Sequence, residues 1–314
     1  MTPELRAFVA AQLAAPCPPA ARAFAEALAR ATEARAALFY GSVLRTGDLE
    51  HSILDFYILT DGARRPGWRG WLSRHLWPDV SYREMTLDGR ALRAKVATMP
   101  LATFRRAAAD GYLDTTIWTR FVQPSALVWA ADSEAEETVT AAIAAASETA
   151  GRYAAALGPA SGRAEDFWAA LFRGTYKAEL RVEKPGRERE IIAFDRARYE
   201  QLLPLAWTSG GVPFTASEGV LRPQLGAETA RRLRAAWARR ARVGKPLNAA
   251  RLVKAASTFE GAARYAAWKI QRHTGVAIEV TPWRERHPVL AAPGAAWTLW
   301  RARKRNGQAQ APGR

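Results

Sequence analysis

Two short apolar segments with one turn between them constrain this chain more than any other feature. The run Leu38 to Tyr40 leads directly into Gly41 and Ser42, and the run Ile53 to Leu59 follows soon afterwards with Asp55 embedded in it. This pattern predicts a strand, a tight turn that needs glycine, the start of a helix and a second strand. We therefore expect neighbouring strands that bring one carboxylate close to a glycine turn.

The turn and the acid are the parts that transfer of a nucleotidyl group requires. Gly41 would let the backbone approach phosphate oxygens, and Ser42 would add a hydroxyl and an N–H at the start of a helix. Asp55 would hold the divalent cation that neutralises the phosphates. Nucleotidyltransferases usually carry a second carboxylate two residues after the first, but that position is Tyr57 here. The second acid must come from elsewhere, or the site is inactive.

Composition sets the class of protein. The chain has 314 residues of which 49% are hydrophobic, enough for one large or two modest domains with real cores. Cys17 is the only cysteine, which excludes an intramolecular disulfide and favours a reducing compartment. Since no apolar run is long enough to span a bilayer and the N-terminus lacks a signal pattern, we expect a cytoplasmic protein.

The charge balance predicts an anionic partner. Lysine and arginine number 46 against 30 acidic residues, which gives a net charge of +16. Nucleic acid, an acidic lipid surface and phosphorylated small molecules all fit such an excess, and charge alone does not choose among them.

The order of the expected elements fits a mixed sheet covered by helices, an α/β fold of the α+β kind. The patterns predict helices over 3–34 with a break at 16–19, a helix over 68–78, a hairpin of strands 82–87 and 91–98 around Asp88-Gly89, a short helix over 103–109, a strand over 126–131 and a long helix from 133 to 157. The helices of 3–34 should pack beside the sheet.

A later segment offers the missing acid. After a helix predicted over 164–173, Tyr176 to Val182 reads as a strand with Lys177, Glu179 and Arg181 on one face. A solvated edge strand would show the same alternation. The functional interpretation of Glu179 therefore depends on a wider comparison of motifs.

Six short blocks, in a fixed order, make that comparison possible. They are Tyr40-Gly41-Ser42, Leu54-Asp55-Phe56, Gly89 to Val96, Arg120 to Pro124, Glu179 to Val182, and Lys245-Pro246 continuing to Phe259. In this order they resemble blocks of the mitochondrial-type phosphatidate cytidylyltransferases, the family of mitochondrial translocator assembly and maintenance proteins. That family also lacks the ordinary second acid on its metal strand. The resemblance covers roughly residues 38 to 260.

The chain departs from the family pattern at three positions. Val43 stands where the family has a second glycine, and Glu179 stands where it has aspartate. The family's hairpin lysine aligns with Arg93, while Lys95 follows two residues later on the same face of the strand. Either side chain could reach a phosphate, and the choice between them is open.

The resemblance implies a reaction in which CTP and phosphatidic acid give CDP-diacylglycerol and pyrophosphate, with Mg²⁺ as cofactor. It assigns Asp55 and Glu179 to the metal, and Lys95 or Arg93 with Arg120 to the departing pyrophosphate. The remaining residues implied to bind the nucleotide or a phosphate are Tyr40, Gly41, Ser42, Arg181, Arg251 and Lys254.

The resemblance and the element order together imply three regions. Residues 1–135 would form the nucleotidyltransferase core. Residues 136–260 would form a mainly helical, winged-helix-like domain that contributes an acidic strand and basic residues. Residues 261–314 combine tryptophans with arginines and lysines, a composition that settles at an anionic bilayer surface. We therefore expect peripheral attachment to the inner face of the cell membrane.

Two other classes of function remain open. A nucleotidyltransferase acting on RNA or on a soluble acceptor would share Gly41, Ser42 and Asp55, and would use the basic run 231–254 on a phosphate backbone, although nucleic acid is the less favoured partner. A non-catalytic scaffold would have lost its metal pair at Tyr57.

Overall fold

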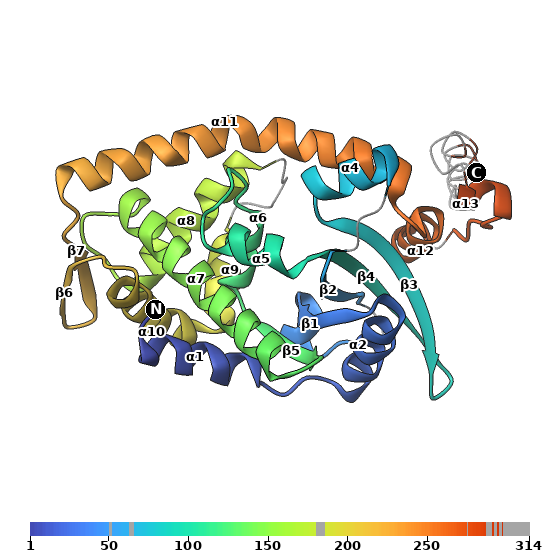
Figure 1. Ribbon diagram of the computed structural model, residues 1–314, viewed down its shortest axis with the longest axis horizontal. Coiled ribbons are helices and arrows are strands. Elements are labelled where there is room, and N and C mark those ends of the chain that lie inside the picture. The colour runs from blue at the N-terminus through green and yellow to red at the C-terminus, as the bar shows by residue number, and fades with distance from the viewer. Residues whose placement is uncertain are drawn as a thin grey trace, which may run out of the picture.

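A five-stranded mixed sheet organises the N-terminal half of the protein (Figure 1). The computed structural model describes residues 1–49, 52–62, 66–179, 186–274 and 276–286, with residues 291, 294 and 297. The strands are β1 (Ala34–Tyr40), β2 (Leu54–Thr60), β3 (Asp79–Leu87), β4 (Arg90–Pro100) and β5 (Ser125–Ala130). They lie in the order β3-β4-β2-β1-β5, and β2 runs parallel to β4 while the other neighbours are antiparallel.

Helices cover both faces of this sheet. Phe56 and Ile58 of β2 pack with α2 (Pro19–Thr32) on one face, and Tyr57 and Leu59 pack on the other. The second face is covered by α5 (Leu101–Ala108), α6 (Thr116–Phe121) and α7 (Ser133–Leu157). The alternation expected along β2 is confirmed, because neighbouring side chains belong to two separate apolar clusters.

The first helix departs from the expected packing. Helix α2 packs beside the sheet, as predicted, whereas α1 (Pro3–Leu13) packs mainly on α7 and α10 (Arg196–Ser209). Its buried residues Leu5, Val9 and Leu13 belong to the cluster that extends into the helical half. The core is therefore continuous from the sheet into the helices, across the expected boundary at residue 135.

The hairpin of β3 and β4 forms as the sequence predicts. Asp88 and Gly89 make the two-residue turn, with φ of 50° and 73°. Both residues have the left-handed conformation that Asp-Gly adopts readily in tight hairpins. The register then places Glu84 opposite Arg93 and Tyr82 opposite Lys95.

The predicted strand over Tyr176 to Val182 is wrong at its start. Helix α8 (Ala164–Ala178) continues through Tyr176 and Lys177, and Glu179 is its C-terminal cap. The buried residues Phe172, Thr175 and Ala178 keep the spacing of a helix, so helical packing outweighs the alternation of charges. Residues 180–185, including Arg181, lie outside the described residues.

The second half is mainly helical with one small hairpin. It comprises α8, α9 (Arg187–Phe194), α10, the hairpin β6 (Phe214–Ser217) and β7 (Val220–Pro223), α11 (Ala227–Thr258), α12 (Ala262–Thr274) and α13 (Pro282–Arg286). Helix α11 runs along the whole upper edge in Figure 1, above both halves. The basic run 231–245 thus lies on one continuous helix, as expected.

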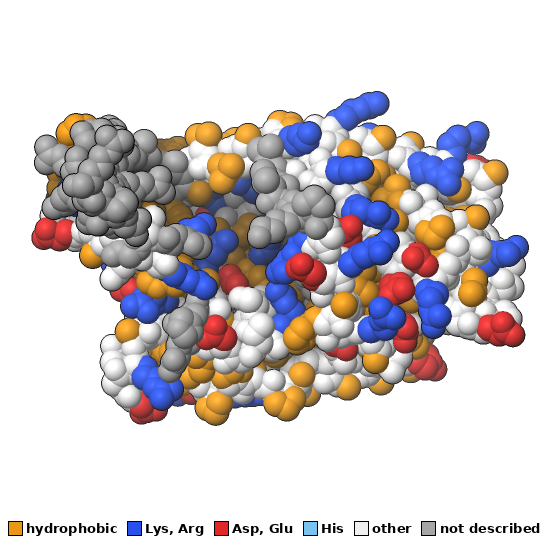
Figure 2. Space-filling view, turned by 180° about the vertical axis from the view of Figure 1, so that it is seen from behind, with side chains coloured by type: hydrophobic (Ala, Val, Ile, Leu, Met, Phe, Trp, Pro, Cys, Tyr) orange, Lys and Arg blue, Asp and Glu red, His pale blue; other side chains and the backbone are white. Residues whose placement is uncertain are grey.

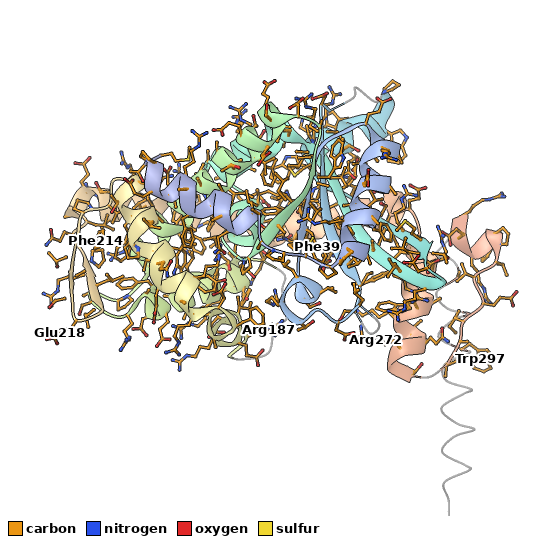
Figure 3. All side chains as sticks on the ribbon, turned by 90° about the horizontal axis from the view of Figure 1, so that it is seen from below. Phe39, Arg187, Phe214, Glu218, Arg272 and Trp297 are labelled. Atoms are coloured by element: carbon orange, nitrogen blue, oxygen red, sulfur yellow. The ribbon has the colours of Figure 1, made fainter. Side chains whose placement is uncertain are left out.

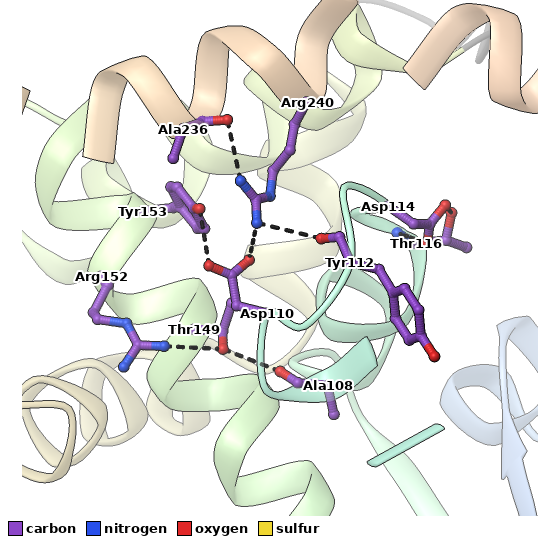
Figure 4. Close-up of polar contacts among 10 residues, drawn as sticks. All are labelled: Ala108, Asp110, Tyr112, Asp114, Thr116, Thr149, Arg152, Tyr153, Ala236 and Arg240. Carbon is purple, nitrogen blue, oxygen red and sulfur yellow. Dashed lines mark hydrogen bonds and ion pairs between the residues drawn. The ribbon is translucent and has the colours of Figure 1, made fainter. Parts of the chain in front are cut away.

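A buried polar network fixes α11 to the rest of the molecule (Figure 4). Arg240 is 5% exposed and its Nη2 lies 2.6 Å from Asp110 Oδ1. The Tyr153 hydroxyl of α7 donates to the other oxygen of Asp110 at 3.0 Å. Two helices, α7 and α11, therefore converge on one carboxylate in the loop that leads into α6.

The fold is a mixed α+β fold with a layout consistent with nucleotidyltransferases. Within the described part of the chain, no helix has the length and apolar content needed to cross a membrane.

Candidate active site

Gly41 and Asp55 meet at the ends of two paired strands. Tyr40 and Asp55 are register partners of β1 and β2, so the turn after β1 lies against the Asp55 carboxylate. Gly41 has φ of 93°, and a Cβ built on it would overlap Asp55 Oδ2. A glycine is thus needed here for its backbone conformation and also for the space it leaves. The next residue, Ser42, begins α3 (Ser42–Thr46).

Three cations from three elements surround Asp55. Lys95 of β4 is its register partner, Arg120 comes from α6, and Arg45 comes from α3. Burial raises the pKa of Asp55, and the positive charges of Lys95, Arg120 and Arg45 act in the opposite direction. The site is therefore a cluster of positive charges around a single desolvated carboxylate, a setting common at functional sites.

Arg120 is held by aromatic rings. Its Nη1 donates to the Tyr40 hydroxyl at 2.8 Å, and its guanidinium lies 5.1 Å from the centre of the Tyr40 ring. Tyr57 is 1% exposed and packs edge-on against Phe121. Tyr57 is thus a core residue that supports Arg120. Arg120 Nε is buried and finds no hydrogen-bond partner among the residues the structure describes, so it could still donate to a ligand oxygen.

Sequence reasoning missed two arginines and a tyrosine that lie near one another, Arg45, Arg187 and Tyr199. Burial lowers the pKa of Arg45, and repulsion from Arg187 of α9 lowers it further, while Tyr199, Asp55 and Tyr176 oppose the shift. Two guanidinium groups that repel one another across a partly buried space favour an anion between them. Figure 3 shows Arg187 on the side of the helical half that faces the sheet.

The Tyr199 hydroxyl lies near Arg45. Like Arg120 Nε, it is buried without a hydrogen-bond partner in the described ranges, and burial raises the pKa of Tyr199 to about 12. The position of Arg45, three residues after Ser42 on the turn helix, was a usable signal in the sequence. Nothing in the sequence placed Arg187 or Tyr199 near Arg45, because that proximity depends on how α9 and α10 pack.

The open choice between Arg93 and Lys95 gains a geometric basis. Arg93 Nε lies 3.5 Å from Glu84 Oε1 on β3, while Lys95 is the register partner of Asp55. Tyr265 of α12 also lies near the site, since burial and then the charge of Asp55 raise its pKa. Lys95 is therefore the hairpin cation that the structure brings to the carboxylate.

Glu179 lies at the start of α6. It is 6% exposed, and the Thr115 hydroxyl donates to its Oε1 at 2.7 Å. Arg120, which reaches Tyr40 and Asp55, lies at the other end of α6. Whether Glu179 and Asp55 share one cation stays a prediction.

The two predicted residues of α11 make contacts within the protein. Arg251 pairs with the buried Asp114, and its guanidinium lies 4.8 Å from the centre of the Trp77 ring. Lys254 is 4% exposed and its Nζ lies 2.5 Å from Asp79 Oδ1. The structure thus gives Lys254 the role of joining α11 to the start of β3, and its binding of a phosphate stays a prediction.

The donor set fits a magnesium ion that arrives with a nucleotide. No group of three or more His, Cys, Asp or Glu side chains that could hold a metal ion occurs in the described part of the chain. Magnesium is commonly bound by one or two carboxylates together with substrate phosphates and water. Asp55, at a turn that leaves the backbone open, meets that requirement.

Figure 2 shows a depression between the sheet half and the helical half, with lysine and arginine side chains on its walls. No protein-family model matches the chain, and no curated protein matches it either.

Proposed function

We propose that the protein is a CTP:phosphatidate cytidylyltransferase, which makes CDP-diacylglycerol and pyrophosphate in phospholipid biosynthesis. The observation that carries the proposal is the Asp55 carboxylate at the Gly41 turn, with Lys95, Arg120 and Arg45 directed at it from three elements. A triphosphate that arrives with its cation would supply negative charge for the three cations and a metal ion for Asp55. The motif resemblance supports CTP and phosphatidic acid as the substrates.

The residues would divide the work between metal and phosphates. Asp55 would hold Mg²⁺, with Glu179 as its proposed second ligand, and the bound ion would neutralise and orient the phosphates. Gly41 and Ser42 would let the backbone contact the triphosphate. Lys95 and Arg120 would stabilise the charge that develops on pyrophosphate as its bond to the α-phosphorus breaks.

The acceptor needs no strong general base. An oxygen of the phosphatidate monoester would form the new bond to the α-phosphorus of CTP, and phosphate monoesters are largely dianionic at neutral pH because their second pKa is about 6. Catalysis would rest on positioning and charge neutralisation. Arg45 and Arg187, which lie close enough to repel each other, are suited to hold this second phosphate.

Attachment to the inner face of the cell membrane would bring the protein to its lipid substrate. The basic, tryptophan-containing segment 261–314 is the proposed attachment region, of which the described residues include α12 and α13.

Product formation from labelled CTP tests the proposal. Wild type, Asp55→Ala and Asp61→Ala are compared with Mg²⁺ and phosphatidic acid in mixed micelles; Asp61 is the matched control because its side chain is 82% exposed at the far end of β2. Lipid-linked product that needs both the lipid and Asp55, but not Asp61, is the expected result. Product with RNA or a soluble acceptor in place of the lipid would contradict it, and failure to bind Mg-CTP would indicate a scaffold.

A further inference from the structure

Helix α4 (Gly67–His75) turns its aromatic face to solvent. Trp68 and Trp71 are 60% and 53% exposed, and the ring of His75, one turn further along, stacks on Trp71 with 4.6 Å between ring centres. Gly70 is the buried residue of this helix. An amphipathic helix normally packs its apolar face on the core. Trp68 and Trp71 therefore present much of their ring surface to solvent.

Helix α11 extends this apolar surface. Leu252 and Val253 are 64% and 74% exposed, among the most exposed large apolar side chains of the protein. Their neighbour Lys254 donates to the Leu76 carbonyl at 2.8 Å, directly after α4. The inward side of this turn thus holds the end of α4, and Figure 1 shows α4 next to α11.

The remaining outward face of α11 is basic. Five of its exposed cationic residues, spaced so that they share one side of the helix, are Arg231, Arg232, Arg239, Arg242 and Lys245. None of the five forms an ion pair with a described residue, in contrast to Arg240, which turns inward to Asp110. We call Trp68, Trp71, Leu252, Val253 and these five cations the α4–α11 face.

We propose that the α4–α11 face docks on the surface of an anionic lipid bilayer. Tryptophan beside arginine and lysine, with aliphatic side chains among them, is the composition that binds at the boundary of headgroups and acyl chains. A second copy of the chain would bring the same positive charges against it, which disfavours self-association. A nucleic-acid backbone would neutralise the charges but would leave Leu252 and Val253 without an apolar partner.

The docking goes beyond the proposed reaction and lies on elements other than the C-terminal segment. Binding of the full chain to vesicles is measured without CTP, on phosphatidylcholine alone and on phosphatidylcholine with phosphatidylglycerol. Wild type should prefer the anionic vesicles, and added salt should weaken its binding. Trp68→Ser/Trp71→Ser should bind about tenfold more weakly, because both interfacial rings are lost.

Two controls separate docking from folding and from chemistry. Phe194→Ser removes an aromatic ring of similar exposure, 52%, on α9 outside this face, and should bind like wild type. Arg239→Gln/Arg242→Gln should reduce the preference for anionic vesicles. Thermal unfolding of each variant shows whether it folds, and activity on short-chain phosphatidate dispersed in detergent should survive in all of them.

Each outcome bears on one proposal. Equal vesicle binding by wild type and the double tryptophan variant would overturn the docking proposal, as would a preference for RNA over vesicles or a dimer that the variant abolishes. Vesicle binding that depends on the tryptophans, in a protein that makes no product, would leave the docking standing and refute the cytidylyltransferase.

Discussion

The Asp55 carboxylate occupies the space that a side chain at position 41 would need. Gly41 follows β1 and Asp55 is the second residue of β2, and the pairing of Tyr40 with Asp55 fixes the two against each other. The turn that would bind phosphate and the acid that would bind metal are therefore one rigid unit. A change in either residue must displace the other.

Replacement of Gly41 by alanine should abolish activity. The positive φ costs a non-glycine residue about 1–3 kcal/mol, and the added methyl group would push Asp55 from its place. Since a displacement of about 1 Å can cost roughly a hundredfold in rate, turnover should fall by at least that factor. Rates of product formation and urea unfolding curves measure the two effects.

Gly47→Ala is the matched control for this variant. Gly47 also has a positive φ, of 70°, but a Cβ there meets nothing within 4 Å. It should lose stability with little loss of turnover. Equal loss of activity in the two variants would show that the strain matters and the contact with Asp55 does not.

The stability of the ligand-free protein should rise when Asp55 becomes asparagine. Because burial raises the pKa of Asp55, the folded state holds the proton more tightly than the unfolded state, and stability is lost as pH rises from about 3.9 through the folded pKa. Asp55→Asn removes this loss. It should unfold at higher denaturant than wild type at neutral pH, and the difference should vanish below about pH 4.

Denaturation at the two pH values, without nucleotide or Mg²⁺, measures this difference. A less stable variant at neutral pH would mean that the contacts of Asp55 with Lys95, Arg120 and Arg45 outweigh its desolvation. The same variant should have lost activity, as expected of a carboxylate retained for function at a cost in stability.

Lys95 should matter more to the reaction than Arg93. Lys95→Ala removes the cation that is the register partner of Asp55, and should lower kcat/KM for CTP by about a hundredfold, or roughly 3 kcal/mol. Arg93→Ala breaks the contact with Glu84 and should cost tenfold or less. Steady-state kinetics over a range of CTP concentrations decides between them, and the reverse order would assign the phosphate contact to Arg93.

Local patterns in the sequence predicted the parts that local chemistry determines. The Asp88-Gly89 turn needs left-handed backbone at two residues, and the alternation in β2 needs only the pleat, so both could be predicted without tertiary information. The strand predicted from Tyr176 onwards was wrong at its start, because alternating charges on the exposed side of a helix can resemble a strand. The buried residues that continue α8 keep helical spacing on the opposite side of the helix.

The rest of the site depends on long-range packing. Arg45 of α3 lies near Arg187 of α9 and Tyr199 of α10 only because of the way these helices pack. The motif resemblance assigned Lys254 to a phosphate, yet its partners Leu76 and Asp79 come from a distant part of the chain. A basic residue in a motif cannot be assigned to a ligand until its partners within the protein are known.

Removal of Asp110 should destabilise the whole protein. Arg240 is buried, and Asp110→Ala would leave its charge without a carboxylate and the Tyr153 hydroxyl without its acceptor. Breaking such a pair from one side should cost about 3 kcal/mol of unfolding free energy. Glu137→Ala breaks the exposed pair with Arg6 and should change stability by less than about 1 kcal/mol. Urea unfolding compares the two variants, and equal small effects would mean that Arg240 reaches solvent or another partner once Asp110 is gone.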